Sequence, residues 1–333
     1  MKELMAKLEE TRKRIDAFIS EVVNIKEEPT ELFKAAKHLI DAGGKRGRPY
    51  VALKACSLVG GEEEEAVPVA AALELLHTFT LIHDDIMDKG DFRRGVVSVH
   101  RQWDTSTAIL AGDLLFAKVF ETIVKFVDPK KVDEGRILKI LQTITEASIS
   151  ICKGQAYDME FESRRAVSEE DYFKMIGGKT AALWEASAKA GAIAGGGSEG
   201  EIEHLSRFGY YAGLAFQLVD DELGLVADEK VVGKSVGGDI REGKMTLIVI
   251  HALKNSSEDQ KKRILKTLGD NSASQTQVRE VIEIIRSLGS IDYVMGKAED
   301  YINKAIESLE IFPDKEAKRD LVEFAEFIVE RKF

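Results

Sequence analysis

The stretch Glu74–Asp88 reads ELLHTFTLIHDDIMD, and it sets the first expectations for fold and chemistry. Its apolar residues recur with helical spacing and run directly into the acidic cluster Asp84-Asp85-Ile86-Met87-Asp88. Residues four apart on a helix lie about 40° apart and one turn along, so Asp84 and Asp88 face the same way. Such a pair suits Mg²⁺, which takes hard oxygen ligands and often binds through carboxylates plus substrate phosphates. A solvated acidic helix end is the alternative interpretation of this cluster alone.

A second apolar segment, Phe216–Gly224, also ends in paired acids, Asp220 and Asp221. Gly224 stands four residues after Asp220, where a carboxylate would complete a one-turn pair. We therefore expect Asp220 to be the ligand of this cluster and Asp221 to act behind it or through water. Glu222 points about 200° away from Asp220 on an ideal helix, and we expect it to be structural.

Basic residues framed by glycine recur along the chain. Two arginines soon after the first cluster can bind the same polyanion as a metal, through bidentate hydrogen bonds. Glycine lets backbone approach a ligand closely, and lysines act as mobile point charges for phosphate. Each stretch alone is explained by a loop or by charge compensation, but together with two acidic clusters they indicate a diphosphate site. The stretches are Gly43–Pro49, Asp91–Gly95, Gly177–Thr180, Gly233-Lys234 and Gly238–Thr246.

Helical periodicity covers almost the whole chain, and no series of alternating β-branched runs appears. Proline is rare (5 in all), and breaks fall at short connectors such as Asp128-Pro129 and Gly195–Gly197. No connector is long enough to be a domain linker. We therefore expect an all-α fold, a single domain over residues 1–333 built as a bundle of about a dozen helices.

Composition limits the possible functions. The formal net charge of −11 argues against a nucleic-acid partner, because no basic patch is extensive enough for duplex binding. No run approaches the ~20 apolar residues needed to span a bilayer, so we expect no stable membrane insertion. The start, Met1–Leu4, continues into a charged amphipathic pattern and lacks the apolar core of a secretion signal, which favours a cytoplasmic location.

Taken together, the motifs resemble the trans-isoprenyl diphosphate synthases, the family of farnesyl and geranylgeranyl diphosphate synthases, and most closely the archaeal geranylgeranyl type. They are Gly-Gly-Lys-Arg-x-Arg-Pro, Asp-Asp-x-x-Asp, Arg-Arg-Gly, Gly-Gly-Lys-Thr and Phe-Gln-x-x-Asp-Asp, spread from Gly43 to Thr246. The resemblance implies an isoprenoid synthase fold with a central cavity and a homodimer. It also implies head-to-tail condensation of isopentenyl diphosphate with dimethylallyl, geranyl or farnesyl diphosphate, using roughly three Mg²⁺ ions per site.

The resemblance also implies roles for individual residues on the allylic side. Asp84, Asp88 and Asp220 would hold Mg²⁺, and Asp85 would belong to the same catalytic set. The departing diphosphate would take the final proton, so no side-chain general base is expected. The backbone oxygens of Lys179 and Thr180, with Gln217, would stabilise the allylic cation. The residues expected to contact the allylic diphosphate are Arg93, Lys179, Thr180, Gln217 and Lys234, with Lys244 close by.

A second, metal-free clamp would hold isopentenyl diphosphate through Lys45, Arg48, His77 and Arg94. Helix geometry agrees for His77, which precedes Asp84 by seven residues and lies within about 20° of its face. A terpene cyclase would lack this clamp and would normally replace the second aspartate pair, so cyclisation is disfavoured.

Product length is expected to depend on Leu76, Phe79 and Thr80. Phe79 stands five residues before the first aspartate, as in the geranylgeranyl type. An ideal helix places Phe79 about 140° off the Asp84 face and Thr80 only about 40° off. Either the helix is distorted or Phe79 lines the chain cavity from the side. We expect geranylgeranyl diphosphate (C20); a C15 or C25 product, or a non-catalytic regulatory subunit, are the alternatives.

Overall fold

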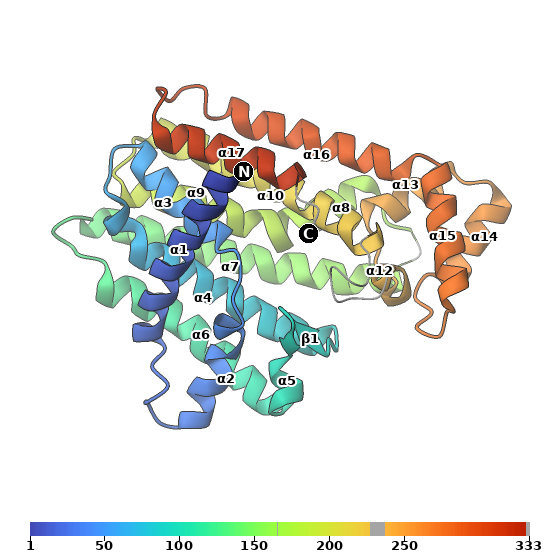
Figure 1. Cartoon of the computed structure of the whole chain (residues 1–333), viewed down its shortest axis with the longest axis horizontal. Coiled ribbons are helices and arrows are strands. Elements are labelled where there is room, and N and C mark those ends of the chain that lie inside the picture. Colours follow the sequence, from blue (N-terminus) through green and yellow to red (C-terminus); the bar gives the residue numbers. More distant parts are fainter. Residues whose placement is uncertain (165, 227–236, 331–333) are drawn as a thin grey trace. The chain divides into compact units, whose positions relative to one another are not determined.

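A computed structural model describes residues 1–164, 166–226 and 237–330. Helices make up nearly all of this part of the chain, as the coiled ribbons of Figure 1 show, so the all-α class is confirmed. One feature was not predicted, a hairpin of two short antiparallel strands, β1 (Phe92–Arg93) and β2 (Val96–Val97). Lys234 lies outside the described residues.

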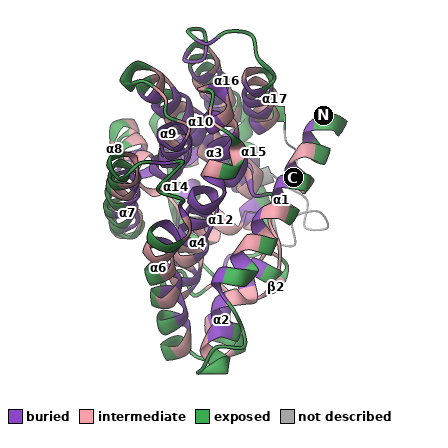
Figure 2. Cartoon of the chain, turned by 90° about the vertical axis from the view of Figure 1, so that its left-hand side faces the viewer, coloured by how far each residue is buried: buried purple, intermediate pink, exposed green. Residues whose placement is uncertain are grey.

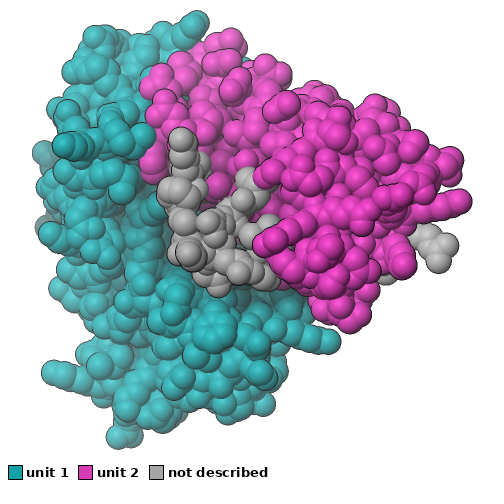
Figure 3. All heavy atoms as spheres, turned by 45° about the vertical axis from the view of Figure 1, so that its right-hand side comes forward, with its two compact units in different colours: residues 1–148, 183–209, 309–323 teal, residues 149–182, 210–308, 324–333 magenta. Residues whose placement is uncertain are grey.

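The chain divides into two compact units, shown in different colours in Figure 3. Several helices contribute residues to both. The expectation of one domain over the whole chain stays a prediction. Unit 1 comprises Met1–Ser148, Leu183–Gly209 and Leu309–Glu323, and unit 2 comprises Ile149–Ala182, Tyr210–Ser308 and Phe324–Phe333.

Unit 1 is organised around α4 (Glu63–Met87), which packs on α1, α3 and α6. By length and composition α4 could cross a membrane, but 72% of its most apolar window is buried inside the protein, as in a core helix. Purple marks these buried residues in Figure 2. The other helices that begin in this unit are α1 (Lys2–Val22), α2 (Thr30–Asp41), α3 (Gly47–Leu58), α5 (Val99–Gln102), α6 (Thr105–Phe126), α7 (Glu134–Ser163), α10 (Glu199–Val226) and α17 (Glu316–Glu330); all of α9 (Ala182–Ala194) after its first residue also belongs here.

Unit 2 contains the remaining parts of α7, α10 and α17 and the further elements named below. Ser168 begins α8 with a capping box, in which its side chain and that of Asp171 bond to each other's backbone N–H. A π-helical turn, η1 (Gly177–Ala181), interrupts the run from α8 to α9. The further elements are α8 (Glu169–Ile176), α12 (Gly238–Glu242), α13 (Leu247–Asn255), α14 (Glu258–Thr267), α15 (Gln275–Ser287) and α16 (Ser290–Glu307).

Candidate functional site

The first aspartate cluster lies at the C-terminal end of α4, in unit 1. The backbone N–H of Asp88 donates to the carbonyl oxygen of Asp84 at 2.8 Å, so helical geometry continues to the last acid of the cluster. Asp84 and Asp88 are therefore one turn apart, as predicted. Asp84 is half-buried and Asp88 is exposed, whereas Asp85 between them is only 1% exposed. The cluster thus divides into two accessible carboxylates and one buried one.

Asp85 holds an arginine of the β-hairpin. Its Oδ1 accepts from Nε of Arg93 at 2.8 Å and lies 2.6 Å from Nη2. Burial raises the pKa of Asp85, and the nearby charge of Arg93 opposes that rise. The other oxygen, Oδ2, is buried and has no hydrogen-bond partner among the described residues. Asp85 therefore positions Arg93, while Asp84 and Asp88 lie on another side of the helix.

A buried glutamate, Glu74, joins two further arginines. Nη1 of Arg46 donates to Glu74 at 2.9 Å, and Nε of Arg46 donates to Asp16 at 2.7 Å. Arg94 approaches the same Glu74 oxygen at 3.3 Å. A Cβ on Gly44 would lie 2.7 Å from Nη1 of Arg46, so glycine leaves the space that this guanidinium fills. Arg46 thus ties the basic turn to the core, a role that the sequence did not reveal.

His77 is a neutral histidine beside this group of arginines. Nη1 of Arg48 lies 3.3 Å from Nε2 of His77. An arginine only donates, so Nε2 accepts and the ring hydrogen sits on Nδ1. Burial lowers the pKa of His77 well below its usual value, and the charges of Arg48 and Arg94 lower it further. Arg48 also lies over the ring of Trp184, 4.7 Å from its centroid, and Lys45 at the start of the same turn is exposed. Unit 1 thus brings together four of the residues named for diphosphate binding.

The second aspartate cluster lies on α10, in unit 2. Asp220 is exposed, whereas Asp221 is buried and both of its oxygens accept hydrogen bonds. Oη of Tyr172 donates to Oδ2 at 2.7 Å, and Nε2 of Gln217 donates to Oδ1 at 2.7 Å. Burial, with the nearby charge of Asp239, raises the pKa of Asp221 to about 7. Gln217 and Asp221 were both named from the sequence, but Tyr172 was not.

The π-helical turn carries the other two predicted residues of unit 2. Oγ1 of Thr180 donates to Oε1 of Gln217 at 2.6 Å, which joins the turn to the second cluster. Nζ of Lys179 pairs with Asp158 of α7, a residue that sequence reasoning missed. A Cβ on Gly154 would lie 2.1 Å from the backbone N of Lys179, so only glycine allows α7 to approach this closely. The glycine-framed basic stretch Gly177–Thr180 thus lies in a π-helical turn that leads directly into α9.

In the second cluster, position 224 has glycine where a carboxylate would complete a one-turn pair with Asp220. A carboxylate from another helix occupies the space beside this glycine. A Cβ built on Gly224 would lie 2.5 Å from Oδ2 of Asp239, on α12. Nζ of Lys244 lies 3.7 Å from the other oxygen of Asp239 and 2.8 Å from Glu242. A carboxylate therefore stands beside the turn after Asp220 although the α10 sequence supplies none.

The three residues named for product length lie on consecutive turns of α4. Leu76 is fully buried, and the hydroxyl of Thr80 donates to the carbonyl oxygen of His77 at 2.8 Å. The ring of Phe79 lies 5.0 Å from that of Phe116 on α6 and 4.7 Å from that of His83. α4 remains α-helical through this segment, so Phe79 packs sideways against α6.

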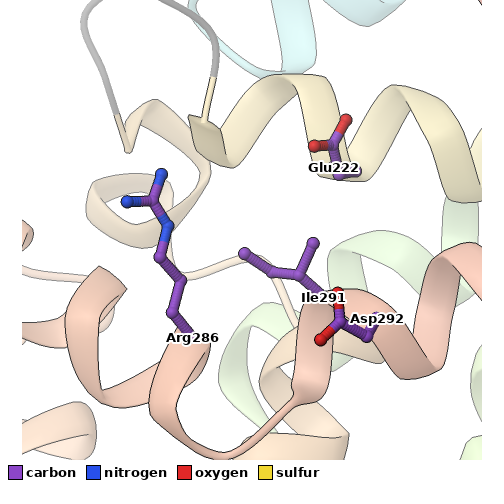
Figure 4. A pocket seen from close by; sticks show the side chains of 4 residues that line it. All are labelled: Glu222, Arg286, Ile291 and Asp292. Atoms are coloured by element: carbon purple, nitrogen blue, oxygen red, sulfur yellow. The ribbon is translucent and has the colours of Figure 1, made fainter.

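A pocket of about 270 Å³ lies in unit 2, on the side of α10 that carries Glu222 (Figure 4). It is lined by Glu222 of α10, Arg286 of α15, and Ile291 and Asp292 of α16. Burial raises the pKa of Glu222, and the charge of Arg286 opposes that rise. Glu222 thus faces α15 and α16, in agreement with its expected structural role.

Comparison with known proteins identifies the family. The polyprenyl synthetase family model matches residues 29–285. The chain is 47% identical over 304 residues to a short chain isoprenyl diphosphate synthase of Methanothermobacter thermautotrophicus, covering 91% of each chain. It is 40% identical to a geranylgeranyl diphosphate synthase of Methanosarcina mazei, covering 99% of each. The crystal structure of geranylgeranyl pyrophosphate synthetase from Pyrococcus horikoshii superposes with a TM-score of 0.93 at 46% identity, again over 99% of each chain. The chain belongs to the polyprenyl synthetase family, and it is a short-chain prenyltransferase of the geranylgeranyl diphosphate synthase type.

Proposed function

We propose that the protein condenses isopentenyl diphosphate head to tail with dimethylallyl, geranyl and farnesyl diphosphate, in a Mg²⁺-dependent reaction, and releases mainly geranylgeranyl diphosphate. The observation that carries the proposal is the neutral His77 beside Arg48 in unit 1. The basic cluster around these two side chains does not, in the described part of the chain, include two carboxylates spaced one helical turn apart. Such a cluster suits a diphosphate bound without metal, whereas Asp84 and Asp88 suit one bound through metal.

The donor set fits Mg²⁺. Asp84 and Asp88 offer hard carboxylate oxygens one turn apart, and Asp220 offers a third on the other unit. The described residues contain no group of three or more His, Cys, Asp or Glu side chains arranged to hold a metal alone. That agrees with an ion bound through one or two carboxylates, water and substrate phosphates. When bound, Mg²⁺ would neutralise charge on the diphosphate as the allylic C–O bond breaks.

The remaining chemistry is assigned to the chain's own side chains. Arg93 and Lys179, with Lys234 and Lys244, would bind the allylic diphosphate, which leaves with the C–O bonding electrons. Lys45, Arg48, His77 and Arg94 would hold isopentenyl diphosphate so that its double bond attacks the allylic cation and forms the new C–C bond. The departed diphosphate then takes the proton whose loss creates the new double bond.

The test uses the purified chain with labelled isopentenyl diphosphate, each allylic primer in turn, and Mg²⁺ or a chelator. We expect magnesium-dependent conversion of all three primers to a C20 product, resolved by chromatography. Absence of product with every primer would refute the proposal, and a dominant C15 or C25 product would refute only its chain length.

Phe79→Ala tests the assignment of Phe79 to product length. Because Phe79 fills the space against Phe116, its removal is expected to lengthen the main product by one or more C5 units. The matched control is Phe120→Ala, which removes the other aromatic ring that packs on Phe116. The same product profile in Phe79→Ala as in the control would remove Phe79 from the gate.

We also propose a homodimer. Apolar side chains project from α6, where Leu110 is 57% and Val124 is 72% exposed, and Figure 2 shows exposed residues along one side of this helix. The two positions lie about 40° apart around a helix. A second copy of the chain would cover them. Light scattering should give twice the chain mass, and Leu110→Glu should lower it; a wild-type monomer would contradict the proposal.

A further inference from the structure

Tyr172 is a buried tyrosine of unit 2 that has no part in the function proposed above. Its side chain is 1% exposed, and its hydroxyl donates to Oδ2 of Asp221 at 2.7 Å. A buried tyrosine hydroxyl normally finds a partner, so one bond alone is unremarkable. What distinguishes this bond is that its acceptor also binds Gln217, a residue assigned to the reacting end of the allylic substrate.

The hydrogen bonds from Tyr172 onward have a defined direction. Each of the two oxygens of Asp221 accepts one hydrogen bond, so each has its own donor. Tyr172 supplies one, and the amide nitrogen of Gln217 must supply the other. The amide oxygen of Gln217 is then turned toward Thr180, whose hydroxyl hydrogen it accepts at 2.6 Å.

The last group in this series of hydrogen bonds is the Thr180 hydroxyl, whose hydrogen points in a fixed direction. A threonine hydroxyl has one hydrogen and two lone pairs. Because Gln217 takes the hydrogen, the Thr180 oxygen presents only lone pairs to the rest of its surroundings. An oxygen so oriented stabilises developing positive charge without having to reorient during the reaction.

We propose that Tyr172 is a positioning residue that, through Asp221 and Gln217, holds the Thr180 hydroxyl with its lone pairs available to the allylic cation. The inference rests on the proposed function. It also gives Asp221 a task separate from metal binding, since both of its oxygens are already engaged while the neighbouring Asp220 is exposed.

The test compares Tyr172→Phe with Tyr293→Phe, a matched control in the same unit. Tyr293 donates to the carboxylate of Glu169 at 2.9 Å, so both variants lose one hydroxyl bonded to an acid. We expect Tyr172→Phe to lower kcat about tenfold, which corresponds to about 1.4 kcal/mol. The KM values of both diphosphates and the Mg²⁺ dependence should stay within about twofold of wild type, as should every parameter of the control.

A double-mutant cycle identifies the route of the effect. Thr180→Val has no hydroxyl to orient, so adding Tyr172→Phe to it should lower kcat by less than about twofold further. A full tenfold loss in that background would overturn the inference, and so would unchanged kcat in Tyr172→Phe alone. If Tyr172→Phe does not fold, Asp221→Asn interrupts the same series from its acceptor, and full kcat there overturns the inference.

The experiments distinguish a failure of the proposed function from a failure of this inference. A wild-type protein that makes no product overturns both conclusions, whereas an active wild type with an unaffected Tyr172→Phe overturns only this one.

Discussion

The two aspartate pairs are the same in sequence but differ in what surrounds them. In each pair the second residue is buried, Asp85 at 1% and Asp221 at 8% exposure, and the first is more accessible. Asp85 is held by the charged Arg93, whereas Asp221 is held by the neutral groups of Tyr172 and Gln217. One dipeptide therefore supports an ion pair in unit 1 and a series of neutral hydrogen-bond donors in unit 2.

The charges around the buried titratable groups also differ between the two units. In unit 1 clustered arginines, added to burial, keep His77 neutral by lowering its pKa. In unit 2 the nearby Asp239, added to burial, raises the pKa of Asp221. The buried member of each pair thus holds a neighbouring side chain, in line with our proposal that the first member of each pair binds the metal.

The largest effect is expected from the accessible members. Asp84→Ala should lower turnover by about a thousandfold or more, because a metal ligand is lost. The unfolding free energy should change by no more than about 1 kcal/mol, because the side chain is half-buried. Steady-state kinetics and denaturant unfolding measure both. Asp300→Ala, an exposed acid of α16, is the control, and near-normal turnover in Asp84→Ala would refute the assignment.

A smaller effect should distinguish the two proposed diphosphate sites by substrate. Lys45→Ala in unit 1 is expected to raise the KM of isopentenyl diphosphate about tenfold and leave that of the allylic substrate unchanged. Lys244→Ala in unit 2 is expected to do the reverse. Initial rates with one substrate varied at a time provide the comparison. Equal effects of either variant on both substrates would contradict separate binding of the two diphosphates.

Substitutions of the two buried aspartates should differ in their effect on the unfolding free energy of the protein. Asp85→Asn leaves the partly buried guanidinium of Arg93 without its counter-charge, and we expect a loss of about 2 kcal/mol in unfolding free energy. Asp221→Asn should cost less than about 1 kcal/mol, since among the described residues Asp221 bonds to Tyr172 and Gln217 and to no arginine or lysine, and burial already disfavours its charge. Denaturant titration of both variants decides this, and a larger loss for Asp221→Asn would reverse the comparison.

The smallest expected effect is a pH dependence from His77. Its folded pKa lies well below that of the unfolded chain, so the unfolded state binds a proton first as the pH falls. The stability from this group is present above the unfolded pKa and is lost below it, by about 0.7 kcal/mol between pH 7 and pH 6. His77→Gln should lack this part of the wild-type profile. Identical pH profiles for variant and wild type would show that folding does not lower the pKa of His77.

Local pattern predicted the helices and the one-turn spacing of Asp84 and Asp88, because both follow from helix geometry over a few residues. The capping box at Ser168 was predictable for the same reason. The product gate could be named but not oriented, since the side contact of Phe79 depends on Phe116 of another helix.

What could not be predicted depends on residues far apart in the sequence. Arg46 and Arg48 stand in one short basic turn, yet Arg46 is buried against Asp16 and Glu74 while Arg48 reaches His77. The contact between Tyr172 and Asp221 likewise joins two different helices. The π-helical turn has no periodic signature of its own and becomes visible only in the backbone hydrogen bonds.

The close approach of Asp239 to Gly224 has a consequence for protein engineering. Replacing Gly224 with aspartate would add a carboxylate one turn after Asp220, but its Cβ would lie 2.5 Å from Oδ2 of Asp239. Two acids would then compete for a space that now holds one. To place the third carboxylate on α10, residue 239 must first be given a shorter side chain. A sequence search that counts only acids close together along the chain would miss Asp239 and would underestimate the number of carboxylates in this cluster.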